Sequence, residues 1–470
     1  MIADIKPYPV MKDSGVPWLG EVPAHWEMKR AKWLFRKMDR PVQDSAEVVT
    51  CFRDGMVTLR KNRRVRGFTE SLKEIGYQGI RRGDLVIHAM DAFAGAIGVS
   101  DSDGKSTPVY SVCEPVPGAN AYYYAYIIRE MARSQWIQAL AKGIRERSTD
   151  FRFDEFGAQC VLMPPLPEQA AIVRYLDYVN RRIRKYIRAK QKLIKLLEEQ
   201  KQAIIHRAVT RGLNPNVRLK PSGVEWLGDV PEHWEVIALR LRYSQCLGKM
   251  LDAKRVLGVN SLPYLRNTDV QWDRINTTDL PVMDIAPSEY DRYTVRLGDL
   301  LVCEGGEVGR CAIWSGGLEP CGFQKAIHRL RPLSLERDLP RFLYYVFRAA
   351  TKGGAFEDGH ESTISHLTGD KLRAHRLPFP DKKEQIEIVA YLDASSAAVD
   401  RIIADALREI ALLREYRTRL IADVVTGKLD VRAAAANLPE EADESEPPEE
   451  VEEPTEDGTD GSVGEGSDEE

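Results

Sequence analysis

The feature that most constrains the fold of this chain is an internal repeat. Residues 14–27 read SGVPWLGEVPAHWE and residues 222–235 read SGVEWLGDVPEHWE, so eleven of the fourteen positions are identical. Self-similarity at a fixed spacing indicates that one structural unit occurs more than once. The chain is therefore expected to hold two tandem copies of a unit of about 210 residues.

Two further segments recur at nearly the same spacing. GDLV at 83–86 matches GDLL at 298–301, and the Glu-Gln pair with the apolar residues that follow it at 168–177 matches 384–393. The offset between the copies grows from 208 residues at the opening motif to 216 at the Glu-Gln pair. Insertions are therefore expected in the middle part of each copy.

The middle part of the first copy has the pattern of a mixed globular domain. Strand-forming residues at 48–50 and 56–58 flank Asp54-Gly55, a favourable hairpin dipeptide. Further strands are expected at 85–87 and 109–112, and a helix at 122–140. Glycine-rich turns separate these segments, so the predicted fold class of each copy is α/β (α+β).

Each copy ends in a long helix with an apolar stripe. Prolines precede each helix, and Gly212 and Gly427 are expected to end them. The stripe has the three- and four-residue steps of a coiled coil. The first stripe, which Lys190 and Gln200 interrupt, is Ile172, Leu176, Val179, Ile183, Tyr186, Leu193, Leu197 and Ile204; the second is Ile388, Leu392, Ser395, Val399, Ile402, Ala406, Leu413, Tyr416, Leu420 and Val424.

A long helix with such a stripe must bury it against a partner. The expected partner is the helix of the other copy, in an antiparallel coiled coil with pseudo-twofold symmetry. Each helix could instead pack on its own globular part or on another protein. The predicted domains are a first globular domain, a central helical spacer, a second globular domain, a C-terminal helical spacer and a disordered acidic tail, at 1–165, 166–212, 213–381, 382–430 and 431–470 respectively.

The formal charge of −4 conceals a basic body. Residues 440–470 contain 16 Asp or Glu and no Lys or Arg, which leaves 67 basic against 55 acidic residues, or +12, for the rest of the chain. A basic body attracts polyanions such as DNA. The tail has too few apolar residues to form a core. It is expected to be a solubilising appendage, or a weak competitor of DNA for the basic face.

Cysteine usage and hydropathy indicate a cytoplasmic protein. The seven cysteines are isolated, with no CxxC pair, so neither a disulfide framework nor a zinc site is expected. They are Cys51, Cys113, Cys160, Cys246, Cys303, Cys311 and Cys321. The N-terminus lacks the pattern of a signal peptide, and no apolar stretch reaches the roughly 18 residues of a membrane span.

Two similar domains on a stiff spacer could read two half-sites on DNA, whose faces recur every 34–36 Å or so. Basic clusters support this, because Arg and Lys neutralise phosphates, Arg can bind guanine, and Asn can bind adenine. Each cluster could also be a solvated charged loop. The candidate DNA-binding residues are Arg60, Lys61, Asn62, Arg63, Arg64, Arg66, Lys142, Arg145, Arg147 and Ser148 in the first copy, and Arg266, Asn267, Gln271, Gln324, Lys325, His360, Ser362 and His366 in the second.

Catalytic motifs are missing from the sequence. An adenine methyltransferase needs an Asp/Asn-Pro-Pro-aromatic motif for the flipped base, and the Pro-Pro pairs here stand at 164–165 and 447–448 without it. FAGAIG at 93–98 and GKS at 104–106 lack the spacing of nucleotide-binding loops. No catalytic or metal-binding residue is therefore expected. The alternatives are an enzyme with a diverged catalytic centre and a non-DNA protein scaffold with two tandem binding domains.

Taken together, these motifs resemble the specificity subunit of type I restriction–modification systems, over residues from about 10 to 430. The resemblance rests on the duplicated opening motif, on GDLVIHAMDAFAGAIGVSD at 83–101, and on the approaches to the helices, MPPLPEQAAIVRYLD at 163–177 and LPFPDKKEQIEIVAYLD at 377–393. STISHLTGDKLRAHRLPFP at 362–380 also fits. KGIRERSTDFRFDEF at 142–156 departs from the common pattern, which makes the DNA contacts of the first copy harder to assign.

The resemblance implies two target-recognition domains, each reading half of an asymmetric, interrupted site in double-stranded DNA. It also implies that the helices dock two copies of a modification subunit, which methylates adenine at N6 with S-adenosylmethionine. Restriction subunits that use ATP and Mg²⁺ would complete a type I site-specific deoxyribonuclease. The chain itself would bind no cofactor and would not contact a membrane. The implied helix-pair and docking residues are Ile172, Leu176, Ile183, Leu193, Leu197, Ile388, Leu392, Val399, Leu413 and Leu420.

Overall fold

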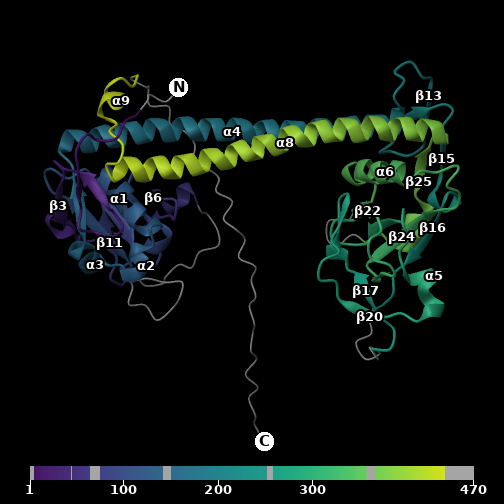
Figure 1. The fold of residues 1–470 in the computed structure, drawn as a ribbon, viewed down its shortest axis with the longest axis horizontal. Coiled ribbons are helices and arrows are strands. Elements are labelled where there is room, and N and C mark those ends of the chain that lie inside the picture. The colour runs from purple at the N-terminus through teal and green to yellow at the C-terminus, as the bar shows by residue number, and fades with distance from the viewer. Residues whose placement is uncertain are drawn as a thin grey trace, which may run out of the picture. The chain divides into compact units, whose positions relative to one another are not determined.

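The computed structural model describes residues 5–43, 45–63, 75–140, 150–250, 258–356 and 366–439. They fall into two compact units. Unit 1 comprises Met1–Tyr186 and Leu412–Glu470, and unit 2 comprises Ile187–Ala411. The two long helices, α4 (Leu166–Arg211) and α8 (Lys382–Val425), each contribute one end to each unit (Figure 1).

Each unit is built around a four-stranded antiparallel sheet. In unit 1 the strand order is β4 (Phe35–Lys37), β11 (Tyr110–Pro115), β8 (Leu85–His88) and β9 (Ile97–Val99). In unit 2 it is β16 (Tyr243–Leu247), β24 (Ile327–Pro332), β21 (Leu300–Cys303) and β22 (Cys311–Ile313). The repeated order confirms the tandem duplication and the predicted α/β (α+β) fold class.

The GD motif explains where the central strand of each sheet begins. Gly83 and Gly298 adopt positive φ angles, which glycine tolerates best. The aspartates that follow are buried, and Arg81 and Arg296 donate backbone N–H bonds of 2.7 Å to Asp84 and Asp299 respectively. The guanidinium that neutralises the aspartate comes from a different place in each unit. Arg40 pairs with Asp84, and Arg331 pairs with Asp299.

A helix packs on each sheet. These helices are α1 (Ala121–Arg133) in unit 1 and α6 (Pro340–Lys352) in unit 2. The single helix predicted at 122–140 is wrong, because it breaks into α1 and α2 (Trp136–Leu140). Gln135 lies between them with a φ of 64°, and this left-handed conformation cannot continue an α-helix.

The insertions expected from the changing offset are small strands that differ between the units. The predicted hairpin at Asp54-Gly55 is confirmed, with Gly55 at a φ of 91°. Unit 1 contains β5 (Val49–Cys51) paired with β6 (Val57–Leu59), and β7 (Gln78–Ile80) paired with β10 (Gly104–Ser106). Unit 2 contains β17 (Ser261–Leu265), β18 (Val270–Gln271), β19 (Arg274–Ile275), β20 (Val282–Asp284), α5 (Tyr290–Tyr293) and β23 (Gly322–Phe323).

In both units, the opening motif forms strand pairs with the segment that leads into the long helix, although more than 130 residues separate the two segments. In unit 1, β1 (Met11–Asp13) pairs with β2 (Glu21–Pro23), α3 (Phe153–Ala158) follows later, and β3 (Glu27–Arg30) pairs with β12 (Cys160–Met163). In unit 2 the equivalents are β13 (Leu219–Pro221) with β14 (Asp229–Pro231), α7 (Gly369–Ala374), and β15 (Glu235–Ala238) with β25 (Arg376–Phe379).

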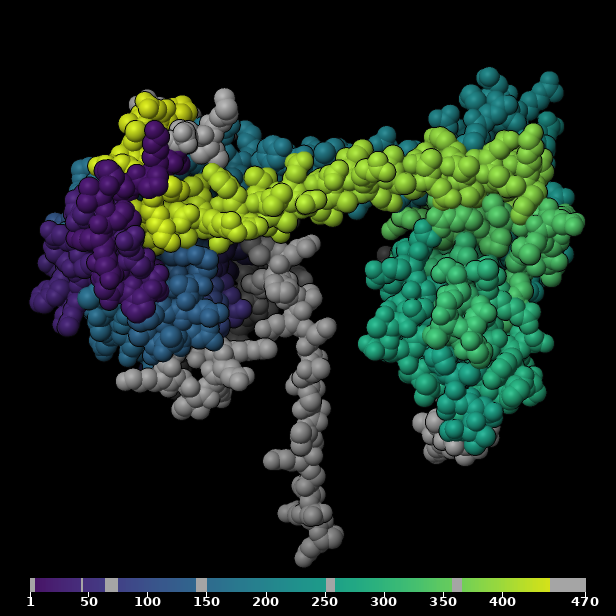
Figure 2. Space-filling view, in the orientation of Figure 1, coloured from purple at the N-terminus to yellow at the C-terminus, as the bar shows by residue number. Residues whose placement is uncertain are grey.

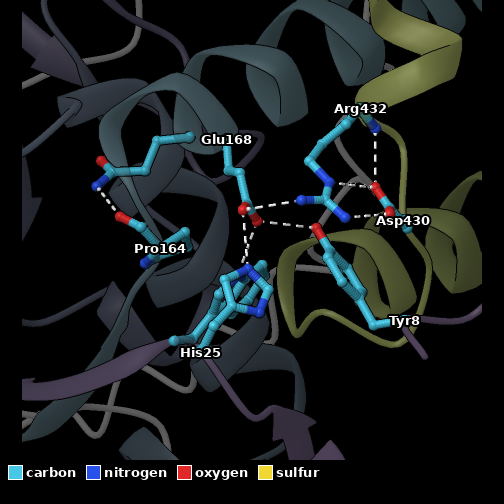
Figure 3. Close-up of polar contacts among 8 residues, drawn as sticks. Tyr8, His25, Pro164, Glu168, Asp430 and Arg432 are labelled. Atoms are coloured by element: carbon cyan, nitrogen blue, oxygen red, sulfur yellow. Dashed lines mark hydrogen bonds and ion pairs between the residues drawn. The ribbon is translucent and has the colours of Figure 1, made fainter. Parts of the chain in front are cut away.

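A buried carboxylate joins these segments in unit 1. Glu168, in the first turn of α4, accepts hydrogen bonds from Trp26 Nε1 at 2.8 Å and from the Tyr8 hydroxyl at 3.2 Å. His25 Nε2 lies 2.8 Å and Arg432 Nη1 lies 3.4 Å from Glu168 Oε1 (Figure 3). Burial raises the pKa of Tyr8, and the charge of Glu168 raises it further. We call Trp26, His25 and Glu168 the helix anchor of unit 1.

Unit 2 has the same anchor, built from His233, Trp234 and Glu384. Glu384 lies in the first turn of α8; its Oε2 accepts from Trp234 Nε1 at 2.9 Å and lies 2.8 Å from His233 Nε2. The glutamine that follows each glutamate makes the same contact in both units. Gln169 and Gln385 each donate to the carbonyl five residues earlier, at 2.8 and 3.0 Å. The two repeated sequence motifs are therefore the two halves of one contact.

The anchors also fix how the long helices pair. Gly427, just beyond the end of α8, packs against Trp26 so closely that an added Cβ would lie 2.8 Å from the indole. Gly212, beyond α4, packs on the other anchor, where an added Cβ would lie 3.0 Å from Glu384 Oε1. Both glycines have positive φ, as predicted for helix ends. In each unit one helix begins where the other ends, so the pair is antiparallel.

The predicted apolar seam is buried only near the helix ends in α4, whereas in α8 Val399 and Ala406 are also buried in the middle. Ile172, Leu176 and Ile183 are buried in unit 1, and Ile388 and Leu392 are buried in unit 2. The middle is more polar. Leu193 is 39% exposed, and within unit 2 the helices are joined by the ion pairs Lys190–Glu409 at 2.8 Å and Lys201–Asp400 at 2.6 Å.

Residues 431–439, which the sequence assigned to the tail, belong to unit 1. Val431 and Ala435 are buried, and α9 (Arg432–Ala436) is a short helix. Asp430 N donates to Lys6 O at 2.9 Å, so the beginning and the end of the described chain lie together on the surface (Figure 2). Residues 431–439 are rich in alanine rather than in acidic residues, which allows them to pack. Among the described helices, none combines the length and apolar character that a bilayer crossing requires.

Replacing Glu168 with Ala tests the anchor. The free energy of unfolding should fall by about 3 kcal/mol, because Trp26 and Tyr8 would keep buried donors without an acceptor. Denaturant unfolding followed by tryptophan fluorescence measures the change. Glu198→Ala, at an exposed position of α4, is the control and should change the value by less than about 0.5 kcal/mol. Equal losses in the two variants would contradict the anchor.

Candidate nucleic-acid interface

The structure places ten of the eighteen predicted DNA-binding residues. The other eight lie outside the described residues: Arg64, Arg66, Lys142, Arg145, Arg147, Ser148, His360 and Ser362. The ten that are described fall into two groups, one in each unit. Their surroundings show which of them come together.

In unit 2, four predicted residues meet at the end of the central strand β21. Asn267 follows β17, and its Nδ2 donates to Gly305 O, two residues beyond β21, at 3.0 Å. His366 lies against the same glycine, since a Cβ on Gly305 would be 3.3 Å from His366 Nδ1. Gln324 N donates to Leu265 O at 3.0 Å, which brings Gln324 and Lys325 beside the end of β17. The sequence did not predict that these segments meet.

We call Asn267, Gln324, Lys325 and His366 the strand-end cluster. Lys325 and His366 are exposed, and Asn267 and Gln324 are half-buried. The cluster offers amide, ammonium and imidazole groups, which can donate and accept hydrogen bonds. Such groups suit base edges and phosphate oxygens.

Arg266 stands beside this cluster in an ion pair. Its Nε and Nη2 each donate to an oxygen of Asp269 at 2.8 Å, and its backbone N–H donates to the same carboxylate at 2.8 Å. Burial opposes the charge of Asp269, but these hydrogen bonds outweigh it and lower its pKa. Gln271 is not part of the cluster. Its Nε2 donates to Thr268 O at 2.8 Å within the next turn.

In unit 1, the four described residues of the basic cluster are held by their own hairpin. Lys61 pairs with Glu47 at 2.6 Å, Asn62 Nδ2 donates to Thr58 Oγ1 at 2.9 Å, and Arg60 Nε donates to Thr50 Oγ1 at 3.4 Å. Arg63 donates to Asp54 Oδ2 at 2.6 Å, and its guanidinium lies 4.5 Å from the ring of Phe52. These contacts brace the β5–β6 turn.

The end of the central strand is equivalent in the two units. Ala89 in unit 1 and Glu304 in unit 2 both follow this strand. Phe151 N donates to Ala89 O at 3.2 Å, and Leu367 N donates to Glu304 O at 2.9 Å. Phe151 and Leu367 come soon after the segments 141–149 and 357–365, which hold six of the eight candidates outside the described residues. Phe151 and Leu367 therefore occupy equivalent places in the two units.

Residues 248–411 match the family model of the type I restriction modification DNA specificity domain. This range contains the whole strand-end cluster. The chain is 22% identical over 292 residues to the type I restriction enzyme EcoKI specificity subunit of Escherichia coli strain K12, and 22% identical over 285 residues to the EcoBI specificity subunit of Escherichia coli. Each alignment covers 58% of this chain and 59% of the relative, so less than two thirds of each relative is spanned.

Residues 248–411 are therefore similar to the DNA specificity domain of type I restriction–modification systems.

Solved structures share the fold over most of the chain. A chain from a structure concerning complex assembly and conformational transition of the type I R-M system has a TM-score of 0.66 at 17% identity, covering 87% of this chain and 99% of that one. The HsdS subunit from Thermoanaerobacter tengcongensis has a TM-score of 0.52 at 18% identity, covering 87% and 98%. The fold shared with these structures therefore extends to unit 1, outside the range of the family model.

Two residues near the cluster, His328 and Gln245, were not predicted from the sequence. His328 on β24 is buried; its Nε2 lies 2.7 Å from Leu367 O, and its Nδ1 lies 2.8 Å from Gln245 Nε2. Burial lowers the pKa of His328, although the contact with Leu367 opposes this. The pair holds the chain beside His366 in place. No local signal marks it, because the three segments are far apart in sequence.

Asp269→Asn tests the ion pair beside the cluster. Because the folded-state pKa of Asp269 lies below its ordinary 3.8, the pair contributes stability above that pH and loses it as the pH falls through the folded value. The variant should melt a few degrees below the wild type near neutral pH, and the difference should shrink below about pH 4. Thermal melts across pH measure this.

The control for that experiment is Asp39→Asn, at an exposed position. This variant should melt with the wild type throughout the pH range. A difference for Asp269→Asn that stays constant down to about pH 3 would show that the ion pair is not its cause.

Proposed function

We propose that the chain is a sequence-specific DNA-binding subunit that reads a bipartite, asymmetric site, one half with each unit. The observation that supports this most is the strand-end cluster of unit 2, which lies at the end of a central strand that unit 1 repeats. The scaffold around it is alike in the two units, but the residues at the strand end differ. Two unlike half-sites follow from this arrangement.

The electrostatics support binding to a polyanion. The chain up to residue 439 carries 67 basic and 55 acidic residues, and phosphate contacts supply most of the affinity for DNA. Arg266 and Arg63 are already in ion pairs with Asp269 and Asp54. A phosphate would have to compete with those carboxylates, whereas Lys325 is exposed.

The proposed partners are two copies of an adenine-N6 methyltransferase modification subunit, together with ATP-dependent restriction subunits. Exposed apolar side chains on the long helices, including Leu193, Ile402 and Leu407, offer surface for docking. Having two similar units fits two copies of one partner. The chain itself is proposed to be non-catalytic, with S-adenosylmethionine, ATP and Mg²⁺ bound by the partner subunits, and to act in the cytoplasm.

Selection from a random duplex library is the central experiment. The chain, with its partners where they are needed for affinity, should enrich a split motif with an unread gap. Asn267→Ala combined with Gln324→Ala should change only one half of that motif and weaken binding by about 1–3 kcal/mol per lost base contact. Glu336→Gln, at an exposed position of unit 2, should leave the motif unchanged.

A different outcome would favour the scaffold alternative. If no motif is enriched, and if binding shows no salt-dependent footprint with two protected half-sites, the proposal fails. If both halves of the motif change in the double variant, the assignment of one half to unit 2 fails.

Lengthening the helices tests the spacer. Adding four residues to α4 after Tyr186 and to α8 after Ala411, where the chain passes between the units, extends each helix by about 6 Å. At about 3.4 Å per base pair, the unread gap should grow by one or two base pairs while both halves stay the same. The same four residues after Pro439 are the control. An unchanged gap in the helix variant would reject the spacer role.

A further inference from the structure

Unit 1 holds a basic helical surface close to the point where the acidic tail begins. In the unit 1 part of α4, five basic residues occur between 174 and 185. The two acidic residues there point inward: Glu168 is in the helix anchor, and Asp177 accepts from the Tyr126 hydroxyl at 2.8 Å. The outward side of this helix is therefore strongly positive.

The basic residues share a face. Arg174 and Lys185 are eleven residues apart, which places them within about 20° around the helix axis, and Arg182 lies about 60° further round. All three are exposed. The guanidinium of Arg182 lies 5.5 Å from the ring of Tyr178 and donates to its hydroxyl at 2.8 Å, which keeps it on the surface. We call Arg174, Arg182 and Lys185 the basic helix face.

The neighbouring part of α8 adds to this charge. It contributes Arg414, Arg417 and Arg419, of which Arg419 pairs with Glu415 at 2.7 Å. The basic helix face therefore lies in a part of unit 1 whose acidic groups are mostly engaged.

The tail starts at this face. Arg174 Nη2 donates to Leu438 O at 3.0 Å, and Pro439 is the last residue described. The 31 residues that follow, 440–470, carry 16 carboxylates and no basic group. A chain of that length can span at most about 100 Å, whereas the helix from Arg174 to Lys185 is about 16 Å long. The tail can therefore reach the whole face.

We propose that residues 440–470 bind the basic helix face of the same chain and compete there with non-specific DNA. Tethering gives the tail an effective concentration of about 1 mM. If the free tail bound with a dissociation constant of about 0.1 mM, it would weaken non-specific DNA binding about tenfold. The inference depends on the proposed function only because DNA is the competitor.

The experiment compares full-length chains that differ in tail charge. In the neutral-tail chain, all 16 Asp and Glu of residues 440–470 become Asn and Gln. This chain should bind a random-sequence duplex about tenfold more tightly than the wild type at low salt, with a steeper salt dependence, because DNA then displaces counterions rather than the tail. Equal affinities would overturn the proposal.

A second set of variants locates the effect. In R174Q/R182Q/K185Q, neutralising the tail should change DNA affinity less than twofold, because the tail has lost its site. In R240Q/R274Q/K352Q, which removes three exposed charges from unit 2, neutralising the tail should still give the tenfold change. Equal effects of the tail in both backgrounds would overturn the assignment to the basic helix face. Circular dichroism melts confirm that each variant is folded.

A direct binding measurement completes the test. A fluorescent peptide of residues 440–470 should bind the neutral-tail chain in a salt-sensitive way and should bind its R174Q/R182Q/K185Q version at least tenfold more weakly. Equal binding to both would reject the site. Motif selection is a separate readout, so a failure of the proposed sequence recognition remains distinguishable from a failure of the tail.

Discussion

A carboxylate in the first turn of a long helix, hydrogen-bonded to a buried tryptophan, organises each unit. Glu168 with Trp26 and Glu384 with Trp234 are the two examples. Glu168 is buried and Glu384 is half-buried, and a carboxylate withdrawn from water is costly unless donors surround it. The glycine that ends the other helix packs on the same site. One contact thus ties the opening motif to both helices and sets their antiparallel order.

This anchor separates what the two copies share from what they vary. The repeated motifs form the anchor and the central strand of each sheet, whereas the strand-end residues come from connecting segments. Ala89 and Glu304 occupy equivalent positions with different chemistry. Connecting segments on a rigid scaffold can change sequence at little cost to stability. A chain built in this way can acquire a new binding preference in one unit while the other unit and the helices remain intact.

The number of basic residues does not by itself give the positive charge that is available to a polyanion. Arg63 and Arg266 are in ion pairs with neighbouring aspartates, so their charge is partly spent within the fold. The basic helix face, by contrast, has its nearby carboxylates turned inward. Local pairing therefore decides which basic residues are available to a polyanion. The proposed competition of the acidic tail with DNA depends both on the charge of the tail and on where the tail is tethered.

The sequence by itself determined the duplication, the long helices with their glycine ends at Gly212 and Gly427, and the hairpin at Asp54-Gly55, because these features depend on residues close together in the chain. It predicted the candidate residues of the strand end but not their meeting. Only the tertiary structure decided that Arg40 serves Asp84 while Arg331 serves Asp299, that a helix breaks at Gln135, and that residues 431–439 pack on unit 1. Such outcomes depend on which distant side chains packing brings within reach, and no local pattern encodes that.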